Sequence, residues 1–281
     1  MMEPLVTISI PIYNAEKYLD YAICSCLNQT YTNWELLLMC DGSTDNSLQI
    51  AESYAAKDAR IIVVNDDTNK GLVYRLNQSV QLAKGKYYAR MDADDIMCVD
   101  RIAEEVNFLE HNQNVNVVGS STMLIDQQNR IVGSAYKGEG DFFAHPSIMG
   151  RLEWFKHNHY DEDFIRMEDS DLWRRTAIPF VNISKPLLFY RIDENHTIRK
   201  MLLSYKTKRK MARHYKRYNK NVVWGVMVYG ESLIKAMISV VADCLGRYDS
   251  VLKKRRYREV IKDELLSEAE LNLAISKRLS L

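Results

Sequence analysis

Cysteine, proline and glycine are all scarce in this sequence of 281 residues, which has 5 Cys, 5 Pro and 11 Gly. The scarcity of glycine and proline excludes a collagen-like or low-complexity chain. The number of cysteines is odd, and their spacing forms neither a disulfide framework nor two CxxC pairs for zinc. We therefore expect the protein to work in a reducing compartment.

A secretion signal is also missing from the start of the sequence, where Met-Met-Glu-Pro leads directly into an apolar stretch. A signal peptide would begin with a charged region and end at a small-residue cleavage site, so we expect none here and predict a cytoplasmic protein. What is present is the composition of a globular protein, with 47% hydrophobic and 27% charged residues. The length lies between one large domain and two small ones.

Charge is distributed unevenly along the chain. Residues 1–198 hold 18 Lys and Arg against 29 Asp and Glu (net −11), whereas residues 199–281 hold 20 against 8 (net +12). Residues 199–220 alone contain ten Lys and Arg and no acid. Such asymmetry indicates a basic appendage that meets something anionic.

Short apolar runs alternate with longer helical stretches over the first 125 residues. The pattern predicts strands at 5–12, 34–39, 60–64, 87–91 and 115–118, and helices at 15–28, 44–56, 72–83 and 101–111. This alternation predicts an α/β fold with a parallel sheet covered by helices on both faces. In such a sheet, the loops after the carboxyl ends of the strands form the ligand crevice.

The sequence loosens after residue 126. We expect a helix near 147–155, another beginning around 168, and a strand at 186–190. Residues 222–245 are strongly apolar, but Glu231, Lys235 and Asp243 interrupt them, so we do not expect a transmembrane span. Instead, an amphipathic helix is predicted, with an apolar face made of Val223, Val226, Met227, Leu233, Ile234, Met237, Ile238 and Val241.

Three aspartates follow the predicted strand at 87–91. Asp92, Asp94 and Asp95 stand within four residues, where their charges repel one another unless a cation or several hydrogen-bond donors compensate them. Mg²⁺ or Mn²⁺, held by one or two carboxylates and by substrate phosphates, suits this arrangement. The alternative is a solvated acidic loop that also caps the following helix.

Further candidate site residues have structural alternatives as well. Asp41 could accept a hydrogen bond from the imide of a base, or the sequence Asp-Gly-Ser-Thr-Asp at 41–45 could simply start a helix with Ser or Thr as its cap. One acid of the pair Glu168 and Asp169 could be a general base, or both could favour the positive end of a helix dipole. His145 could orient a substrate, or it could belong to a turn in which Ser147 caps a helix.

The order of these motifs carries a resemblance. They are Pro-Ile-Tyr-Asn at 11–14, Asp-Gly-Ser-Thr-Asp at 41–45, Asn-Lys-Gly at 69–71 with Arg75, Asp-Ala-Asp-Asp at 92–95, His-Pro-Ser at 145–147 and Glu-Asp-Ser-Asp-Leu-Trp-Arg at 168–174. Over residues 4–195 the sequence resembles glycosyltransferase family 2, the inverting enzymes of the GT-A fold. The resemblance implies a nucleotide-sugar donor, most commonly a UDP-sugar, and a divalent metal.

The resemblance also implies a role for each site residue. Pro11, Tyr13, Asp41, Lys70 and Arg75 would bind the donor, Asp92 would face ribose and metal, Asp94 would be the direct metal ligand of the DXD motif, Asp169 would be the general base, and His145, Glu168 and Trp173 would lie on the acceptor side. Two features depart from the family. Cys40 replaces a commonly acidic residue, and the stretches 132–145 and 173–190 look short. His196 is a weak candidate for a third metal ligand.

These inferences predict a GT-A catalytic domain over residues 1–198, with a donor-binding half at 1–125 and an acceptor half at 126–198. Residues 199–281 are predicted to be a basic, helical extension. The predicted activity is metal-dependent, inverting transfer of a hexose or N-acetylhexosamine to a surface polysaccharide or glycolipid. A nucleotidyltransferase is the alternative within the fold, although residues 14–18 are not the Gly-rich phosphate loop it needs. A catalytically silent nucleotide-sugar-binding or scaffold protein is the alternative from another class.

The C-terminal extension has two interpretations of its own. Its apolar stripe could pack on the catalytic domain, or the stripe and the flanking basic clusters at 199–220 and 253–258 could attach the protein to the inner face of the cell membrane. We predict the peripheral membrane attachment, through residues 199–258. Binding to nucleic acid is not predicted, because the basic stretch contains no recognisable nucleic-acid-binding module.

Overall fold

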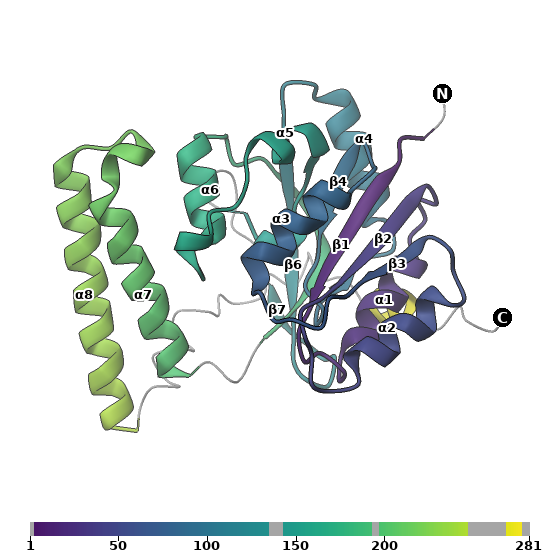
Figure 1. Cartoon of the computed structure of the whole chain (residues 1–281), viewed down its shortest axis with the longest axis horizontal. Helices are drawn as coiled ribbons and strands as arrows, with labels where there is room; N and C mark the ends of the chain where they lie inside the picture. The colour runs from purple at the N-terminus through teal and green to yellow at the C-terminus, as the bar shows by residue number, and fades with distance from the viewer. Residues whose placement is uncertain (1–2, 135–142, 193–196, 247–267, 277–281) are drawn as a thin grey trace. The chain divides into compact units, whose positions relative to one another are not determined.

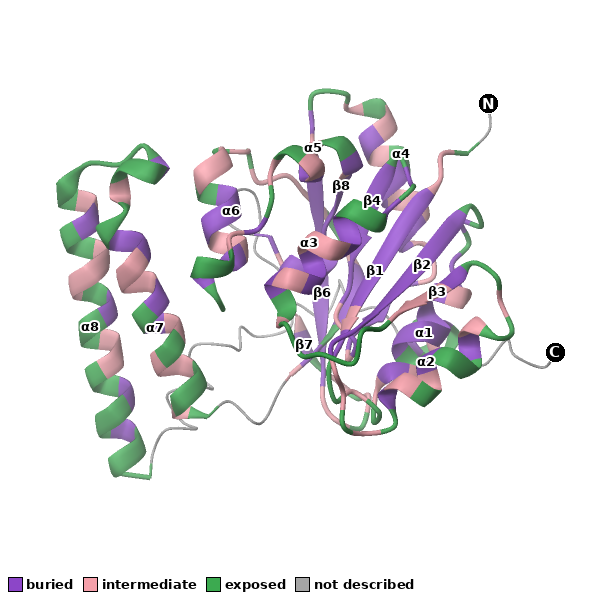
Figure 2. Ribbon diagram, in the orientation of Figure 1, coloured by how far each residue is buried: buried purple, intermediate pink, exposed green. Residues whose placement is uncertain are grey.

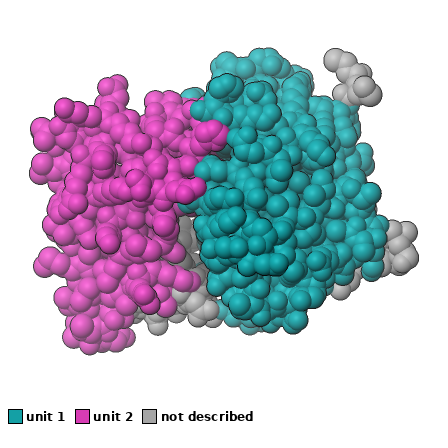
Figure 3. Space-filling view, in the orientation of Figure 1, with its two compact units in different colours: residues 1–157, 179–192, 259–281 teal, residues 158–178, 193–258 magenta. Residues whose placement is uncertain are grey.

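The computed structural model describes residues 3–134, 143–192, 197–246 and 268–276. His196 and the basic cluster predicted at 253–258 lie outside these ranges. The chain forms two compact units (Figure 3). The first comprises residues 1–157, 179–192 and 259–281, and the second comprises residues 158–178 and 193–258.

The first unit contains the sheet and the helices that cover it. Its elements are β1 (Val6–Ile12), α1 (Leu19–Leu27), β2 (Trp34–Cys40), α2 (Ser47–Ala55), β3 (Ile61–Val64), α3 (Leu72–Leu82), β4 (Tyr87–Arg90), β5 (Ile96–Met97), α4 (Arg101–His111), β6 (Val117–Ile125), β7 (Ile131–Ser134), η1 (His145–Ser147), β8 (Met149–Arg151), α5 (Leu152–His157), β9 (Asn182–Arg191) and α10 (Glu268–Ile275). All the strands and helices predicted before residue 112 are present, with ends shifted by a few residues. The predicted α/β fold is confirmed.

The sheet has the strand order β3-β2-β1-β4-β8-β6-β9-β5, and β7 pairs with β6. Figure 1 shows β3, β2, β1 and β4 of this order. β1 pairs in parallel with β2 and β4, and β2 pairs in parallel with β3. The other half is mixed, because β8 runs antiparallel to both β4 and β6. The predicted parallel sheet is therefore confirmed for its first half, where parallel strand ends meet at one edge.

Burial on both faces explains why the central strands are so apolar. In β1 every second side chain, including Ile8 and Ile10, joins a hydrophobic cluster with residues of α1 and α4. The alternate residue Thr7 is also buried, and its Oγ1 accepts a hydrogen bond of 2.9 Å from the backbone N–H of Gly85, just beyond α3. Figure 2 shows the central strands buried along their length. A parallel sheet covered on both faces requires this pattern.

The structure corrects two predicted elements. The helix predicted at 147–155 is wrong in its first half, where residues 149–151 form β8, and α5 begins only at Leu152. Gly150 lets this strand pass close to its neighbour, because an added Cβ would lie 2.7 Å from the backbone oxygen of Asn116. The strand predicted at 115–118 is β6, which begins at Val117 and continues to Ile125.

The helix α10 packs on the first unit although it lies near the end of the chain. Leu271 and Ala274 join a buried cluster whose other members, from β5, β6, β9 and the turn after β5, are Ile96, Cys98, Met123, Ile125 and Phe189. The Asn28 Nδ2 group, next to α1, donates to the backbone oxygens of Ala274 (2.8 Å) and Ser276 (2.7 Å). This amide satisfies carbonyl groups that the end of a helix leaves free.

The second unit is helical in the residues described. It contains η2 (Glu162–Phe164), α6 (Glu168–Thr176), α7 (Ile198–Arg213), η3 (Tyr215–Tyr218) and α8 (Val222–Cys244). The predicted C-terminal helix is confirmed as α8, whose first turn is capped by Asn221 accepting from the Trp224 N–H at 3.0 Å. α7 and α8 lie side by side (Figure 1), joined by an ion pair of 3.0 Å between Lys208 and Glu231.

A buried carboxylate ties α6 to the segment after α7. Asp171 is fully buried and accepts hydrogen bonds from Arg217 Nε (3.0 Å) and from the Tyr218 hydroxyl (2.9 Å). The compact units consequently place α6 with α7 and α8, and α10 with the sheet. The predicted boundary at residue 198 separates a catalytic segment from a C-terminal extension by function, not by compactness. It stays a prediction.

A buried ion pair beneath β4 generates a stability prediction. Arg101 and Glu105 have fully buried side chains with an Nε to Oε1 distance of 3.1 Å, and burial raises the pKa of Glu105 to about 7. Removing one partner of a buried pair typically costs about 3–5 kcal/mol, because the other group is left without compensation. We expect Arg101→Met to lower the unfolding free energy of the first unit by about this amount, measured by urea denaturation.

An exposed pair provides the matched control. Lys156 and Glu153 on α5 lie 3.0 Å apart in contact with solvent. Lys156→Met should leave the unfolding free energy of the first unit unchanged within error, because water screens such pairs. Equal losses in Arg101→Met and Lys156→Met would contradict the importance assigned to the buried pair.

Candidate active site

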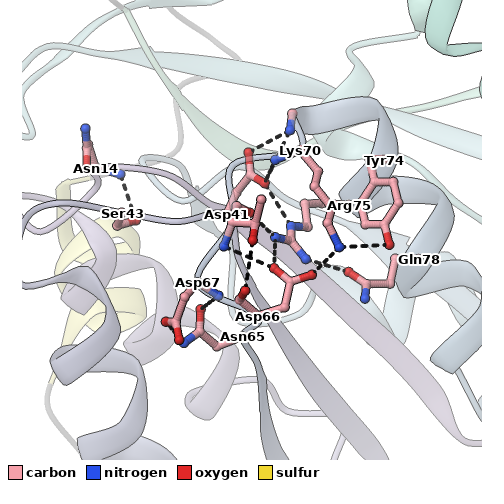
Figure 4. Close-up of polar contacts among 12 residues, drawn as sticks. Asn14, Asp41, Ser43, Asn65, Asp66, Asp67, Lys70, Tyr74, Arg75 and Gln78 are labelled. Atoms are coloured by element: carbon pink, nitrogen blue, oxygen red, sulfur yellow. Dashed lines mark hydrogen bonds and ion pairs between the residues drawn. The ribbon is translucent and has the colours of Figure 1, made fainter.

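The candidate site lies at the edge of the sheet where β1, β2, β3 and β4 end. The loops after β1 and β2 are braced against each other (Figure 4). The Asn14 N–H donates to Ser43 Oγ at 3.1 Å, and Asn14 Oδ1 accepts from the Thr44 N–H at 2.8 Å. Asn14 adopts a left-handed backbone conformation (φ +48°), which asparagine tolerates better than most residues. The alternative in which Ser43 or Thr44 caps α2 is wrong, because α2 begins at Ser47 and its cap position is Asn46.

Asp41 and Arg75 form the centre of this edge. Asp41 is 5% exposed, and the Arg75 side chain is fully buried. Asp41 Oδ1 accepts from Arg75 Nε (2.9 Å) and from the Lys70 N–H (2.8 Å), while Oδ2 accepts from the Gly71 N–H (3.0 Å). Three residues that were predicted to bind the donor, Asp41, Lys70 and Arg75, are thus brought into direct contact.

Asp66 belongs to the same cluster, and the sequence did not indicate its role. Arg75 Nη2 donates to Asp66 Oδ1 and to the Thr68 backbone oxygen, both at 2.6 Å, and Lys70 Nζ lies 2.6 Å from Asp66 Oδ2 (Figure 4). Hydrogen bonds from Arg75 and Lys70 lower the pKa of Asp66 well below its usual range. The available signal was its position, because Asp66 follows the strand predicted at 60–64.

Two other predicted donor-binding residues lie at the end of β1. Pro11 is opposite Met39 of β2 in the parallel register. Tyr13 follows the strand, and 54% of it is exposed, which is unusual for a large aromatic residue at the edge of a buried sheet. An exposed aromatic ring can stack on the flat face of a base. Whether Pro11 and Tyr13 do so stays a prediction.

The acidic loop after β4 is held mainly by arginines. Arg90 is buried, and its Nη2 donates to Asp92 Oδ1 at 2.5 Å. Asp95 is also buried, and its Oδ1 accepts from the backbone N–H of Arg191 at 2.8 Å. Burial raises the pKa of Asp95 well above its usual range, and the charges of Asp94 and Asp92 add to this effect. The loop therefore brings three carboxylates close together beside the buried Arg90 and Arg191.

These residues fit a divalent metal that is shared with a substrate. No group of three or more His, Cys, Asp or Glu that could hold a metal is found among the described residues. Asp92 and Asp94 offer carboxylate oxygens, and Mg²⁺ commonly takes one or two carboxylates together with substrate phosphates.

His145 and Ser147 lie in the short helix η1, and both are buried. Burial lowers the pKa of His145 well below its usual value, and the charge of Arg90 adds to this, so the ring is neutral at pH 7. Ser147 does not cap a helix, because its Oγ bonds to the backbone of Ser120 on β6, accepting from the N–H at 3.1 Å. The acceptor-side role of His145 stays a prediction.

The remaining predicted residues lie in the second unit, on α6. Asp169 is partly buried, and its Oδ1 accepts from the Ser170 N–H at 2.6 Å. Glu168 and Trp173 are buried. Their neighbour Asp171 is occupied by Arg217 and Tyr218, which leaves Asp169 as the more accessible aspartate of the helix. The base role of Asp169 and the acceptor-side roles of Glu168 and Trp173 stay predictions.

Comparison with known proteins identifies the family. The model of Glycosyl transferase family 2 matches residues 7–170, which include all the strand-end loops described above. The chain belongs to this family.

The relatives agree that this family 2 member is a glycosyltransferase. An uncharacterized glycosyltransferase of Haemophilus influenzae is 40% identical over 218 residues, which make up 69% of this chain and 67% of that protein. An uncharacterized glycosyltransferase of Methanocaldococcus jannaschii is 31% identical over 252 residues, or 82% of this chain and 87% of that protein. The enzyme class expected from the sequence is therefore confirmed.

Solved structures confirm the GT-A fold. S. aureus TarS 1-349 in complex with UDP is similar, with a TM-score of 0.62, 19% identity and coverage of 81% of this chain and 70% of that chain. The mannosyltransferase PcManGT from Pyrobaculum calidifontis, in complex with GDP-Man and Mn²⁺, has a TM-score of 0.60 and 17% identity, over 98% of this chain and 86% of that chain. At these identities the likeness establishes the fold alone.

A glycine substitution tests how tightly the strand-end loops fit. Gly42 has φ +64°, and an added Cβ would lie 2.7 Å from the backbone nitrogen of Asn69. We expect Gly42→Ala to cost at least about 1 kcal/mol, because the left-handed conformation alone disfavours Ala by roughly this amount, and the clash adds to it. The measurement is the free energy of unfolding from urea denaturation.

Gly230, within α8, provides the control, because an added Cβ there has no neighbour within 4 Å. Gly230→Ala should stabilise the helix by up to about 1 kcal/mol. If Gly42→Ala proves as well tolerated as Gly230→Ala, the close approach of the two loops is wrong.

Proposed function

We propose that the protein transfers a hexose or N-acetylhexosamine from a UDP-sugar to a hydroxyl group of a surface polysaccharide or glycolipid, with a divalent metal and with inversion at the sugar. The observation that carries this proposal is the buried Asp41–Arg75 cluster on the same sheet edge as the acidic loop 92–95. One part of this edge suits a base, and the other suits a diphosphate with its metal.

The hydrogen-bond count at Asp41 supports a base with an imide N–H. An ionised carboxylate offers about four acceptor sites. Three donors already bind Asp41, namely the backbone N–H groups of Lys70 and Gly71 and the Arg75 Nε group. The Gly71 N–H is shared between Oδ1 (3.3 Å) and Oδ2 (3.0 Å), so among the described residues Oδ2 accepts only this shared proton. Oδ2 would also accept an N–H such as that of uracil, while Tyr13 would stack on the ring. Cytosine lacks this N–H, so CMP-sugars fit less well.

The acidic loop supports the metal. Asp94 would be the direct ligand, and Asp92, next to Arg90, would face both the ribose and the metal. Mn²⁺ or Mg²⁺, when bound, would neutralise the negative charge that develops on the departing diphosphate. The protein's own contribution is to keep Asp92 and Asp94 fixed before the donor arrives, because preorganised charges avoid the cost of rearrangement during the reaction.

Asp169 would act as the general base. It would accept the proton of the acceptor hydroxyl while the oxygen attacks C1 of the sugar from the face opposite the diphosphate. The C1–oxygen bond forms as the bond to the diphosphate breaks, so a single displacement inverts C1, and an α-linked donor gives a β-glycoside. The neutral His145, together with Glu168 and Trp173, would lie toward the acceptor.

Two substitutions separate metal binding from base catalysis. We expect Asp94→Ala to abolish transfer and to weaken Mn²⁺-dependent UDP binding. Asp169→Asn should abolish transfer and leave that binding intact, because the amide cannot take the proton. Transfer is followed as UDP released from UDP-sugars, and binding as the rise in melting temperature with UDP and Mn²⁺.

The exposed Glu162 of the second unit is the control, and Glu162→Gln should retain both properties. Wild-type turnover by Asp169→Asn would contradict the base assignment. A larger rise in melting temperature with GDP-, CMP- or dTDP-sugars than with UDP-sugars would contradict the choice of donor.

We also propose that the second unit attaches the enzyme to the inner face of the cell membrane. Length and composition alone would let α8 cross a membrane. Its charged residues instead support a position along the surface, because Glu231 pairs with Lys235 on the same helix and with Lys208 of α7. The face of α8 away from its buried Ser232 and Ser239 is apolar and exposed, with Met227 and Met237 exposed by 68% and 67%. Figure 2 shows exposed stretches along α8. Amphipathic helices bind membrane interfaces in this way.

Point variants test the attachment, because truncation at residue 198 would remove helices that pack with α6. Vesicles of phosphatidylglycerol and phosphatidylcholine should carry the wild-type protein upward in a density gradient, and Met227→Glu with Met237→Glu should abolish this flotation. The control is Leu82→Glu, which adds a charge at an exposed apolar residue of α3 in the first unit. Flotation of the double variant at wild-type level would contradict the proposal.

A further inference from the structure

Arg191 is the last residue of β9, and it joins the acidic loop at 92–95 to the turn between β6 and β7. No sequence motif indicated this role. Arg191 is 3% exposed. Its Nε donates to the backbone oxygen of Asp94 at 2.7 Å, and its own backbone N–H donates to Asp95 Oδ1 at 2.8 Å. One residue at the end of β9, the strand that pairs with β5 directly after the loop, thus holds two consecutive residues of the loop.

The rest of the guanidinium is anchored on other elements of the first unit. Nη1 donates to the backbone oxygen of Asp126 and Nη2 to Asn129 Oδ1, both at 2.6 Å, in the turn between β6 and β7. The guanidinium carbon lies 4.0 Å from the centre of the Tyr18 ring, which immediately precedes α1. A stacked cation with hydrogen bonds on three nitrogens has little freedom to move.

We infer that Arg191 is a positioning residue that fixes the backbone of Asp94, and thereby aims the Asp94 carboxylate for metal binding. The inference rests on the proposed function, because it requires Asp94 to be a metal ligand. The direction of a side chain follows from the backbone that carries it, so a fixed Asp94 carbonyl restricts where the carboxylate can point. Arg191 contacts no reacting atom itself.

The shape of the guanidinium matters as much as its charge. Its planar fork reaches the Asp94 carbonyl, the Asp126 carbonyl and the Asn129 amide at once. A lysine ammonium is a compact charge on a flexible stem and cannot reproduce this set of fixed directions. Arg191→Lys therefore keeps the positive charge near the loop while it removes most of the restraint.

A purely structural role for Arg191 predicts a different result. If Arg191 only held β9 against the β6–β7 turn, its replacement would lower stability and leave the metal requirement unchanged. Arg151 of β8 supplies the comparison, because its side chain also bonds to backbone oxygens, those of Val115 (3.1 Å), Leu109 (2.9 Å) and Asn112 (3.3 Å). None of these oxygens belongs to the acidic loop.

The experiment is a titration of UDP into the full-length protein at a series of Mn²⁺ concentrations. We expect Arg191→Lys to need about tenfold more Mn²⁺ for half-maximal UDP binding, because residues that orient a metal ligand typically contribute 10–100-fold to metal affinity. Binding at saturating Mn²⁺ should remain. Tyr18→Leu, which removes only the stacked ring, should shift the Mn²⁺ requirement in the same direction by a smaller factor. Arg151→Lys should lower the melting temperature and leave the requirement unchanged.

The outcomes separate this inference from the proposed function. If both Arg191→Lys and Tyr18→Leu need the same Mn²⁺ as the wild type, the positioning role is overturned, whatever their melting temperatures. If Asp94→Ala in the same assay keeps its Mn²⁺-dependent UDP binding, the proposed metal ligand is wrong, and the inference falls with it. Loss in Asp94→Ala together with a shift in Arg191→Lys supports both.

Discussion

A carboxylate removed from water must be supplied with hydrogen-bond donors, and the strand-end loops of this protein are built around that requirement at Asp41. The buried Arg75 supplies one of these donors to Asp41. A buried arginine itself needs hydrogen-bond acceptors, which Asp66 and the Thr68 carbonyl provide. The loops after β2 and β3 are thus fixed by one ion-pair network. This network holds a polar edge rigid above an apolar sheet, and rigidity of this kind favours selective binding.

Local hydrophobic patterns were sufficient to predict the strands and helices that follow a single strand or helix periodicity. The strands and helices up to residue 112 were predictable, because buried β-branched runs alternate with helical stretches of ordinary length. The pattern failed at residues 149–151, where Met149 and Leu152 fit helical spacing. The chain pairs there as a strand because Gly150 admits a close neighbour. Tertiary pairing overrides propensity in short segments of this kind.

The candidate site divides in a similar way. Motif order predicted the residues of the strand ends, and the structure brings Asp41, Lys70 and Arg75 together. Asp66 was missed although Lys70 and Arg75 are close to it in sequence, because it belongs to no motif. Arg191 was missed because it acts through contacts with residues distant in sequence, which no spacing rule encodes. Arg191 reaches the acidic loop across 96 or 97 positions of chain. Asp169 lies in the other unit, so the proposal that it is the general base rests on the sequence motif.

The anchoring of α10 on the first unit has a consequence for the connectivity of the chain. Since residues 259–281 return to the unit that holds the sheet, the chain passes between the two units at four places, after residues 157, 178, 192 and 258. Two bodies joined by several connections stay at a high local concentration relative to each other. A single proteolytic cut in any of these connections would leave the helical unit covalently retained through the other three.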